Sequence, residues 1–234
     1  MSNFSTAFLV TLVFASLARW VRGVSFGGAI AGAVVCFLLY VGAGVGAFVA
    51  LVLVFALTWT CTRFGYRRKE KLGTAEKLDG RTAWQVLANL AVAAGCAGLS
   101  AVTARRAVFL LALSAALSEA AADTVSSELG QARSTSARLI TTWQEVPAGT
   151  DGGISSVGTA AGIASAAVVS LVCVITGLIP LRWLGTSIIA ALAGMIADSF
   201  LGALLERRKL LNNDAVNFLG TLIAAATASL LVIP

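Results

Sequence analysis

Residues 113–130 read LSAALSEAAADTVSSELG, an apolar helical pattern that carries acidic residues where a buried helix normally has Leu or Val. At 100° per residue, four polar residues of this stretch fall within an arc of about 100°: Glu119, Asp123, Ser126 and Ser127. A carboxylate inside a membrane costs several kcal/mol, so intramembrane acids usually face a protein interior or a wet cavity. The stretch therefore predicts a central helix with one polar face. The alternative is a helix that ends in water near residue 122.

The composition around this stretch indicates a membrane protein. Of the 234 residues, 58% are hydrophobic and 12% are charged, and the mean hydropathy is +0.90. These values are typical of a chain that crosses the bilayer several times and exclude an ordinary soluble domain. We therefore expect an all-α, polytopic transmembrane helical bundle that forms one domain over residues 1–234. The pattern favours about eight spans, with seven as the alternative.

The side chains available for chemistry are restricted. There is no histidine, and the four cysteines (Cys36, Cys61, Cys96 and Cys173) lie in or beside apolar runs without C-x-x-C spacing. This pattern supports neither a disulfide framework nor a zinc site. Any reaction must therefore use Asp, Glu, Lys, Arg and a hard cation.

Polar or glycine-containing breaks separate the apolar runs. The expected spans are residues 3–18, two spans within 24–62, then 82–103, the acidic helix, 157–179, 183–205 and 215–233. The stretch from Gly42 to Gly46 divides the long run into two. Two pairs of glycines four residues apart, Gly28 with Gly32 and Gly158 with Gly162, predict close helix contacts.

The basic residues predict an orientation. Alternating eight spans places 14 of the 17 Lys and Arg residues in the loops of one side and only Arg105, Arg106 and Arg182 on the other. Basic loops mark the cytoplasmic side of a membrane protein, so the net charge of +6 indicates orientation rather than nucleic-acid binding. We expect the 14-charge side to face the cytoplasm, in the cell inner membrane.

Polar residues recur four apart on three other helices. The sets are Arg81, Gln85 and Asn89; Gly194, Asp198, Gly202 and Glu206; and Asn213, Asn217 and Thr221. At 1.5 Å per residue, Asn89, Asp123, Asp198 and Asn217 each lie roughly 8–12 Å inside the basic ends of their helices. A single amide is explained as well by an interhelical hydrogen bond, but four stripes at one depth favour a shared site.

Glu128 does not belong to the acidic stripe, because nine residues place it about 180° from Glu119. Two interpretations follow. Either the helix unwinds before Gly130, which then acts as its C-terminal cap, or Glu128 serves the following loop.

That loop contains residues 147–156, PAGTDGGISS. Its residues Gly149, Thr150, Asp151, Gly152 and Gly153 suit a backbone that turns N–H groups toward an anion, and Ser155 or Ser156 can cap the next helix. Glycine turns between helices are common, and no G-x-x-x-x-G-K-[ST] is present, so the loop alone is a weak signal. Beside carboxylates suited to Mg²⁺ and four basic residues (Lys69, Lys71, Lys77 and Arg81), it favours a phosphoryl-transfer site.

At these residues the chain resembles a known family. The motifs are residues 80–81 (GR) with 83–89 (AWQVLAN), 122–130 (ADTVSSELG), 147–155 (PAGTDGGIS), 198–202 (DSFLG), and Asn213 with 216–218 (VNF). In this order, and over nearly the whole chain, they are similar to the integral membrane family that includes phytyl-phosphate kinase. The resemblance implies transfer of a phosphate from CTP to an isoprenyl monophosphate, giving the diphosphate. Dolichol kinase and phosphatidate cytidylyltransferase, which also pair CTP with a membrane lipid, are more distantly similar.

The stripes and the resemblance together assign roles. We expect Asp123, Glu128, Asp198 and Arg81 to be catalytic, with Mg²⁺ on Asp123 and Asp198 and with Glu119 and Glu128 as further metal candidates. Phosphates would be bound by Lys71, Arg81 and the loop residues Gly149, Thr150, Asp151, Gly152 and Gly153. Nucleotide or acceptor would be positioned by Gln85, Asn89, Ser127, Ser199, Asn213 and Asn217.

The expected partners are an isoprenyl monophosphate, a nucleoside triphosphate and the membrane lipid, with a homo-oligomer possible and no nucleic acid. Three alternatives stay open. One is a transporter of an anionic or phosphorylated metabolite, which should carry polar residues through the full membrane thickness. The others are a CTP-dependent lipid cytidylyltransferase and an assembly or scaffold protein, although a scaffold needs no acids at depth.

Overall fold

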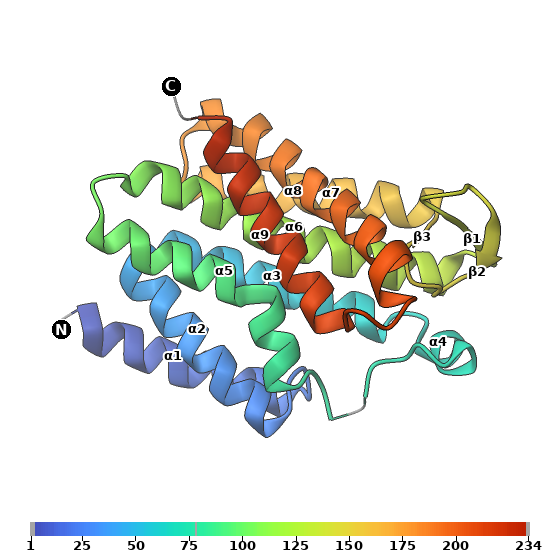
Figure 1. Ribbon diagram of the computed structural model, residues 1–234. Coiled ribbons are helices and arrows are strands. Elements are labelled where there is room, and N and C mark those ends of the chain that lie inside the picture. Colours follow the sequence, from blue (N-terminus) through green and yellow to red (C-terminus); the bar gives the residue numbers. More distant parts are fainter. Residues whose placement is uncertain (1–2, 78, 233–234) are drawn as a thin grey trace.

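The computed structural model describes residues 3–77 and 79–232. Its helices are α1 (Asn3–Trp20), α2 (Phe26–Ala43), α3 (Val45–Arg63), α4 (Tyr66–Leu72), α5 (Ala83–Val102), α6 (Arg106–Arg133), α7 (Ser156–Ile175), α8 (Leu184–Leu201) and α9 (Asn213–Leu230), with a 3-10 turn η1 (Leu181–Trp183) and a π-helical turn η2 (Gly202–Glu206). Figure 1 shows the long helices side by side, with α4 and a small sheet at one end and the start of α1 and the end of α9 at the other.

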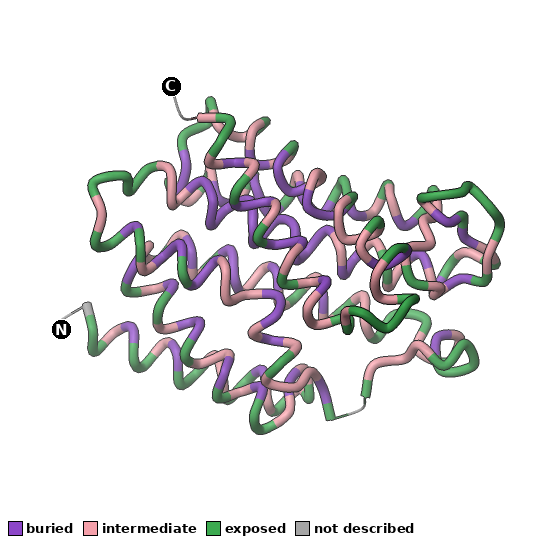
Figure 2. Tube along the Cα trace, in the orientation of Figure 1, coloured by how far each residue is buried: buried purple, intermediate pink, exposed green. Residues whose placement is uncertain are grey.

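Helix α6 is the centre of the bundle. It packs against α3, α5, α7, α8 and α9, and Figure 2 shows it buried along most of its length. Small residues such as Ala112, Ala116 and Ala120 cover its surface, so several helices approach it closely at once. The predicted central helix is confirmed. The alternative of a helix that ends in water near residue 122 is wrong, because α6 continues to Arg133.

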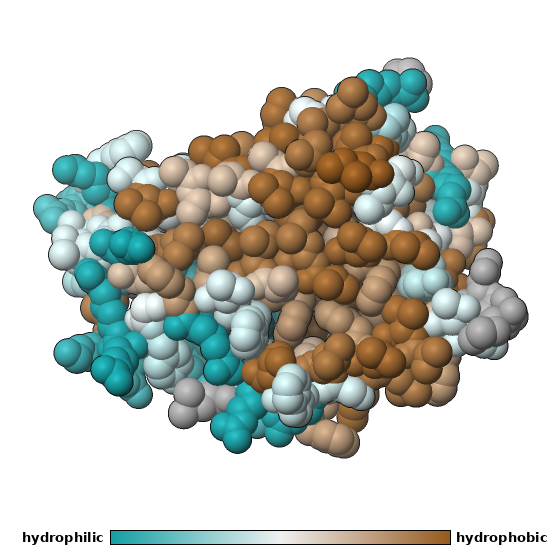
Figure 3. All heavy atoms as spheres, turned by 180° about the vertical axis from the view of Figure 1, so that it is seen from behind, coloured by the Kyte–Doolittle hydropathy of each residue, from teal (hydrophilic) through white to brown (hydrophobic). Residues whose placement is uncertain are grey.

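The helical bundle predicted from composition is also confirmed. Among the described residues, six helices are long and apolar enough to cross a membrane, and α1 over Phe4–Trp20 is a shorter apolar helix. That makes six to seven candidate spans, as in the seven-span alternative. Helix α9 is the eighth long helix, but Asn213, Asp214 and Asn217 in its first turns lower its apolar character. Figure 3 shows a broad apolar band on one face of the molecule, with hydrophilic residues gathered toward the end that carries α4 and the sheet.

Glycines determine where α2 ends and how closely α7 packs against α6. Gly44 has φ +87°, a left-handed conformation, and separates α2 from α3 at the predicted break. Gly158 and Gly162 pack against α6 as predicted, since an added Cβ would lie 2.6 Å from the Ser126 carbonyl oxygen and 3.0 Å from that of Ala122. These contacts leave no room for a side chain between α6 and α7.

The other glycine predictions need correction. Gly28 does pack closely, against the backbone of Arg81, but Gly32 has nothing within 4 Å of an added Cβ and makes no close helix contact. Gly130 is not a C-terminal cap. It lies inside α6 with an added Cβ at 3.0 Å from Ser155 Oγ, so its missing side chain serves the contact with α7.

The segment predicted as a plain polar loop between α6 and α7 contains a three-stranded antiparallel sheet. Its strands are β1 (Ser136–Leu139), β2 (Glu145–Pro147) and β3 (Gly153–Ile154), in the order β2-β1-β3. Ser136 pairs with Pro147, and Leu139 pairs with Gly153. The pairing holds the glycine-containing turn between β2 and β3 over the end of the bundle.

Candidate functional site

A polar cavity of about 660 Å³ opens at the end of the bundle that carries α4 and the sheet. Its walls come from α5, α6, α8 and α9, the segment before α5, and the turn between β2 and β3. The predicted site residues that line it are Arg81, Gln85, Asn89, Asp123, Ser127, Glu128, Gly149, Thr150, Asp151, Gly152, Gly153, Asp198, Ser199, Asn213 and Asn217. The four polar stripes therefore meet at one cavity, as their common depth predicts.

Two predicted site residues lie elsewhere. Lys71 is on α4, a helix that the sequence interpretation did not include, and is exposed away from the cavity. It follows Lys69 by two residues, or about 200° of helix, so burying Lys69 turns Lys71 toward solvent. Glu119 is 1% exposed and lies one turn deeper in α6 than Asp123.

The Asp123 and Asp198 carboxyl groups, from α6 and α8, lie within hydrogen-bonding reach of each other. Two carboxyl oxygens in this region, Glu119 Oε1 and Asp198 Oδ2, are buried without a hydrogen-bond partner among the described residues. Both of these oxygens approach Gly220 of α9, where an added Cβ would lie 2.5 Å from Glu119 Oε1 and 3.4 Å from Asp198 Oδ2. The glycine leaves the space that these two oxygens face.

This donor set fits a Mg²⁺ ion, but not the larger site predicted from four carboxylates. In residues 3–77 and 79–232, no group of three or more His, Cys, Asp or Glu side chains is arranged to hold a metal ion. Mg²⁺ is usually bound by one or two carboxylates and completes its shell with water and substrate phosphates. The facing carboxyl groups of Asp123 and Asp198, one of them with an unpartnered oxygen, meet that requirement.

Glu128 is used differently from either sequence interpretation. Its carboxylate accepts hydrogen bonds from Thr62 Oγ1 at 2.9 Å and from the ammonium group of Lys69. Lys69 is fully buried and also donates to the backbone carbonyl oxygens of Cys61 and Thr62 at the end of α3. Glu128 therefore anchors α4 to α6, and its pairing with Lys69 and Thr62 does not match its predicted role as a further metal ligand.

The lining of the cavity has more acidic than basic residues. Its acidic residues are Glu76, Asp123, Glu128, Asp151, Asp198 and Glu206, and its one basic residue among the described positions is Arg81. No hydrogen bond or ion pair in the described chain ties up the Arg81 guanidinium, although it lies close enough to Asp123 to attract its charge. A polyanionic ligand would therefore need accompanying cations to enter this cavity.

The backbone of Arg81 is fixed by the turn between α1 and α2. Its N–H donates to the Gly23 carbonyl oxygen at 3.1 Å, and its carbonyl oxygen accepts from the Ser25 N–H at 2.9 Å. One residue later, Thr82 begins α5 with a capping box in which the Gln85 side chain bonds the Thr82 N–H at 2.7 Å. The polar stripe predicted on α5 therefore begins at Arg81, whose backbone is held by these hydrogen bonds.

The turn between β2 and β3 offers fewer free amides than its sequence suggests. Thr150 N–H donates to the Pro147 carbonyl oxygen, and Gly153 N–H donates to that of Thr150. In the described structure the N–H groups at positions 149, 151 and 152 have no such bond. Gly152, with φ +72°, sits where an added Cβ would be 2.6 Å from the Cα of Ala203 in η2, which places the turn directly against the end of α8. The predicted cap is confirmed, since Ser155 Oγ accepts from the Gly158 N–H.

Several lining residues were not among the predicted site residues, and three of them show what the sequence signalled and what it did not. Glu206 shares the stripe of Asp198 at eight residues' spacing, so the pattern contained a signal for it. Glu76 accepts a 2.9 Å hydrogen bond from Gln85 Nε2, a contact that depends on how its loop folds back onto α5. Trp143, with φ +59° and 63% exposed, reaches the cavity from the turn between β1 and β2. Nothing in the local sequence marks that turn as part of the site.

Comparisons with known proteins agree with a membrane protein of this size. The family model described as integral membrane protein DUF92 matches residues 9–225. An uncharacterized membrane protein of Methanocaldococcus jannaschii is 33% identical over 224 residues, which cover 92% of this chain and 88% of that protein. An uncharacterized membrane protein of Synechocystis is 33% identical over 195 residues, covering 82% of this chain and 76% of the relative. Protein VTE6, chloroplastic, of Arabidopsis thaliana is 29% identical over 219 residues, covering 90% of this chain and 66% of that protein. No solved structure matches the chain.

Proposed function

Because the chain belongs to the DUF92 family of integral membrane proteins, we propose that it is a membrane-embedded kinase that transfers a phosphate from CTP to an isoprenyl monophosphate. The motif resemblance to the family that includes phytyl-phosphate kinase supports this reaction and this donor. One structural observation carries the proposal. The carboxyl groups of Asp123 and Asp198 face each other in a cavity that Arg81 and the glycine turn also line.

The charge of the cavity supports a metal-assisted transfer. Mg²⁺ would be held by Asp123 and Asp198, and when bound it would neutralise charge on the nucleotide phosphates. Arg81 can bind a phosphate with two parallel hydrogen bonds, because its guanidinium group is not otherwise engaged in the described chain. The amides of Gly149, Asp151 and Gly152 provide further donors for a phosphate.

The transfer itself needs little proton chemistry. An oxygen of the acceptor monophosphate forms a bond to the γ-phosphorus of CTP, while the bond from that phosphorus to the bridging oxygen breaks and CDP leaves with the electron pair. The acceptor oxygen is already ionised at neutral pH, so no strong general base is required and a chain without histidine can perform the step. Alignment of the two phosphates and electrostatic stabilisation supply most of the acceleration.

A transporter of a phosphorylated metabolite is less well supported. A translocation path requires polar groups across the whole bundle, together with a gap through which the substrate moves. Deep polar side chains of α6, α7 and α8 bond to one another instead: Ser114 with Ser187, Ser187 with Ser170, and Ser170 with Ser118, each at 2.9 Å. These hydroxyls join the helices and leave the polar cavity at one end of the bundle.

The test is an assay of the purified protein in detergent with Mg²⁺, farnesyl or geranylgeranyl monophosphate, and CTP, ATP, UTP or GTP. We expect the prenyl diphosphate, with CTP preferred and with the free prenyl alcohol a poor acceptor. A cytidylylated lipid with release of pyrophosphate would replace the kinase by a cytidylyltransferase. If no nucleotide is consumed while a labelled phosphorylated metabolite accumulates in proteoliposomes, the protein is a transporter.

The proposal also requires the cavity to face the cytoplasm, where CTP is available, and we place the protein in the cell inner membrane on its charge bias. Thr74→Cys and Ser134→Cys, in a cysteine-free background, introduce single thiols at the basic end of the bundle. Impermeant thiol reagents should label them only after the membrane is opened. Labelling of either variant in intact cells would contradict the orientation.

A further inference from the structure

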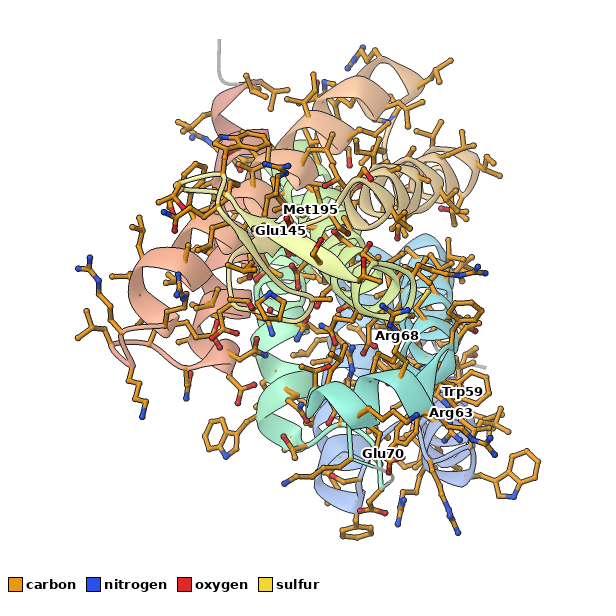
Figure 4. All side chains as sticks on the ribbon, turned by 90° about the vertical axis from the view of Figure 1, so that its right-hand side faces the viewer. Trp59, Arg63, Arg68, Glu70, Glu145 and Met195 are labelled. Atoms are coloured by element: carbon orange, nitrogen blue, oxygen red, sulfur yellow. The ribbon has the colours of Figure 1, made fainter. Side chains whose placement is uncertain are left out.

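A second cavity, of about 340 Å³, lies beside the polar one and is mostly apolar. It is enclosed by α1, α2, α3 and α5, with walls that include Phe14, Ala18, Gly32, Leu51, Phe55 and Leu90. Figure 4 looks onto the end of the bundle that carries α4 and the sheet. Trp59 and Arg63, which line the apolar cavity, lie apart from Met195, which lines the polar one.

The two cavities share one wall. Glu76, Arg81, Gln85 and Asn89 line both of them. A molecule that fills the apolar cavity and ends at this wall therefore presents its end group beside Arg81, on the path to Asp123. The polar group best suited to that position is an anion, because Arg81 is the cation of the shared wall.

The basic residues of the apolar cavity gather at the same end. Arg22, Arg63, Lys77 and Arg81 are its cationic lining residues, and Glu76 is its acidic one. The charge there is therefore the reverse of that in the polar cavity, where acids predominate. A lipid with an anionic head and an apolar chain matches both parts of this lining.

The length of the cavity favours a long hydrocarbon chain. Leu51 lies 12 residues before Arg63 on α3, so the lining extends roughly 18 Å from the charged end at 1.5 Å per residue. That distance is more than half of a hydrocarbon core about 30 Å thick. A chain of a few carbons would leave most of the cavity empty.

We propose that this cavity is the binding site for the hydrocarbon chain of a single-chain lipid monophosphate, whose phosphate lies at Arg81. The proposal deepens the proposed function and rests on it for the role of the lipid as phosphate acceptor. The close contact between Gly28 and the backbone of Arg81 fixes this junction, because it holds the start of α5 against α2. The chain would then be held by α1, α2, α3 and α5, while the nucleotide occupies the cavity between α5, α6, α8 and α9.

Gly32 provides a direct test, because it lines the cavity and an added Cβ there meets nothing within 4 Å. Gly32→Leu should fill part of the cavity without disturbing the packing of the protein. Each CH₂ group of a ligand that is excluded from an apolar site weakens binding about fourfold, so the loss of two such groups corresponds to about a 16-fold weaker affinity. Gly95→Leu is the matched control. Gly95 is also a helical glycine with open space around it, but it lies outside the lining.

Binding would be measured by calorimetry in detergent, without nucleotide, with geranylgeranyl monophosphate and dimethylallyl monophosphate as probes. We expect Gly32→Leu to weaken binding of the long-chain probe at least about tenfold and to leave the short-chain probe unchanged, with Gly95→Leu like the unmodified protein. Gly32→Ala should give a smaller loss and serves if the Leu variant does not fold. Equal affinity of Gly32→Leu and Gly95→Leu for the long-chain probe would overturn the chain site. Equal competition by geranylgeraniol or by a two-chain phosphatidate would overturn the monophosphate or the single-chain assignment.

These outcomes are separate from the fate of the kinase proposal. A protein that binds the long-chain monophosphate in this cavity but never consumes CTP keeps the chain site and loses the proposed reaction. A protein that forms the prenyl diphosphate with unchanged KM for the lipid in Gly32→Leu keeps the reaction and loses the chain site.

Discussion

Replacing Lys69 by Met should strongly destabilise the protein. Lys69 is fully buried, and its ammonium group donates to the Cys61 and Thr62 carbonyl oxygens at 3.0 and 2.6 Å and to the Glu128 carboxylate. The Met side chain fills a similar volume but leaves Glu128, whose side chain is 15% exposed, without its cation. Removing one partner of a buried ion pair costs about 3–5 kcal/mol, and the partial exposure of Glu128 favours the lower end. Since 1 kcal/mol shifts the unfolding midpoint of a chain of this size by about 2–4 °C, we expect a decrease of roughly 10 °C.

The assay is thermal unfolding in detergent, followed by the fluorescence of the five tryptophans. Lys71→Met is the matched control, because Lys71 is on the same short helix but exposed, and surface substitutions usually stay within about 0.5 kcal/mol. The double variant Lys69→Met/Glu128→Gln removes both charges and should regain part of the stability lost in Lys69→Met. Equal midpoints for Lys69→Met and Lys71→Met would refute the buried pair. So would a double variant whose loss equals the sum of the two single losses, since residues in contact couple by about 0.5–3 kcal/mol.

Three further predictions concern the cavity. Asp198→Asn should reduce turnover about 100-fold or more without lowering the unfolding midpoint, because it removes a proposed metal ligand and also relieves repulsion among neighbouring acids. Asp214→Asn, outside the cavity, should retain activity, and full activity of Asp198→Asn would contradict the proposed metal pair. Gly152→Ala should lower the unfolding midpoint more than Gly73→Ala does. Both positions have positive φ, but only at position 152 would the new Cβ meet backbone atoms. Equal effects of the two substitutions would argue against the contact with η2. Chelation of divalent cations by EDTA should abolish turnover, and added Mg²⁺ should restore it; turnover that persists in EDTA would exclude a metal requirement.

Particular residues show where reasoning from the sequence succeeded. Asp123 and Asp198 were predicted to share a site because each interrupts an apolar helix at the same depth, and the structure brings them together. The cap at Ser155 and the break at Gly44 were predictable for a similar reason, since capping and left-handed turns are decided by residues within one turn of the chain.

Other residues show why the rest was not accessible. Gly130 fits a C-terminal cap as well as a helix contact, and only the position of α7 distinguishes the two. Lys69 and Lys71 have the same charge in the same basic segment, yet one is withdrawn to pair with Glu128 and the other faces solvent. The sequence could not rank them, because the rotation of α4 about its axis depends on contacts with α3 and α6.

The sequence by itself determined that the chain is a helical membrane protein, where most of its helices begin and end, and which four of them carry polar residues at one depth. These properties follow from the apolar length of a segment, its periodicity and its caps, all of which act over a few turns of helix. Only the tertiary structure decided which acids face one another, which lysine is buried, and that an apolar cavity meets the polar one at Arg81. Those features depend on side chains distant in the sequence, such as Lys69 and Glu128, 59 residues apart, whose meeting is decided by how whole helices pack.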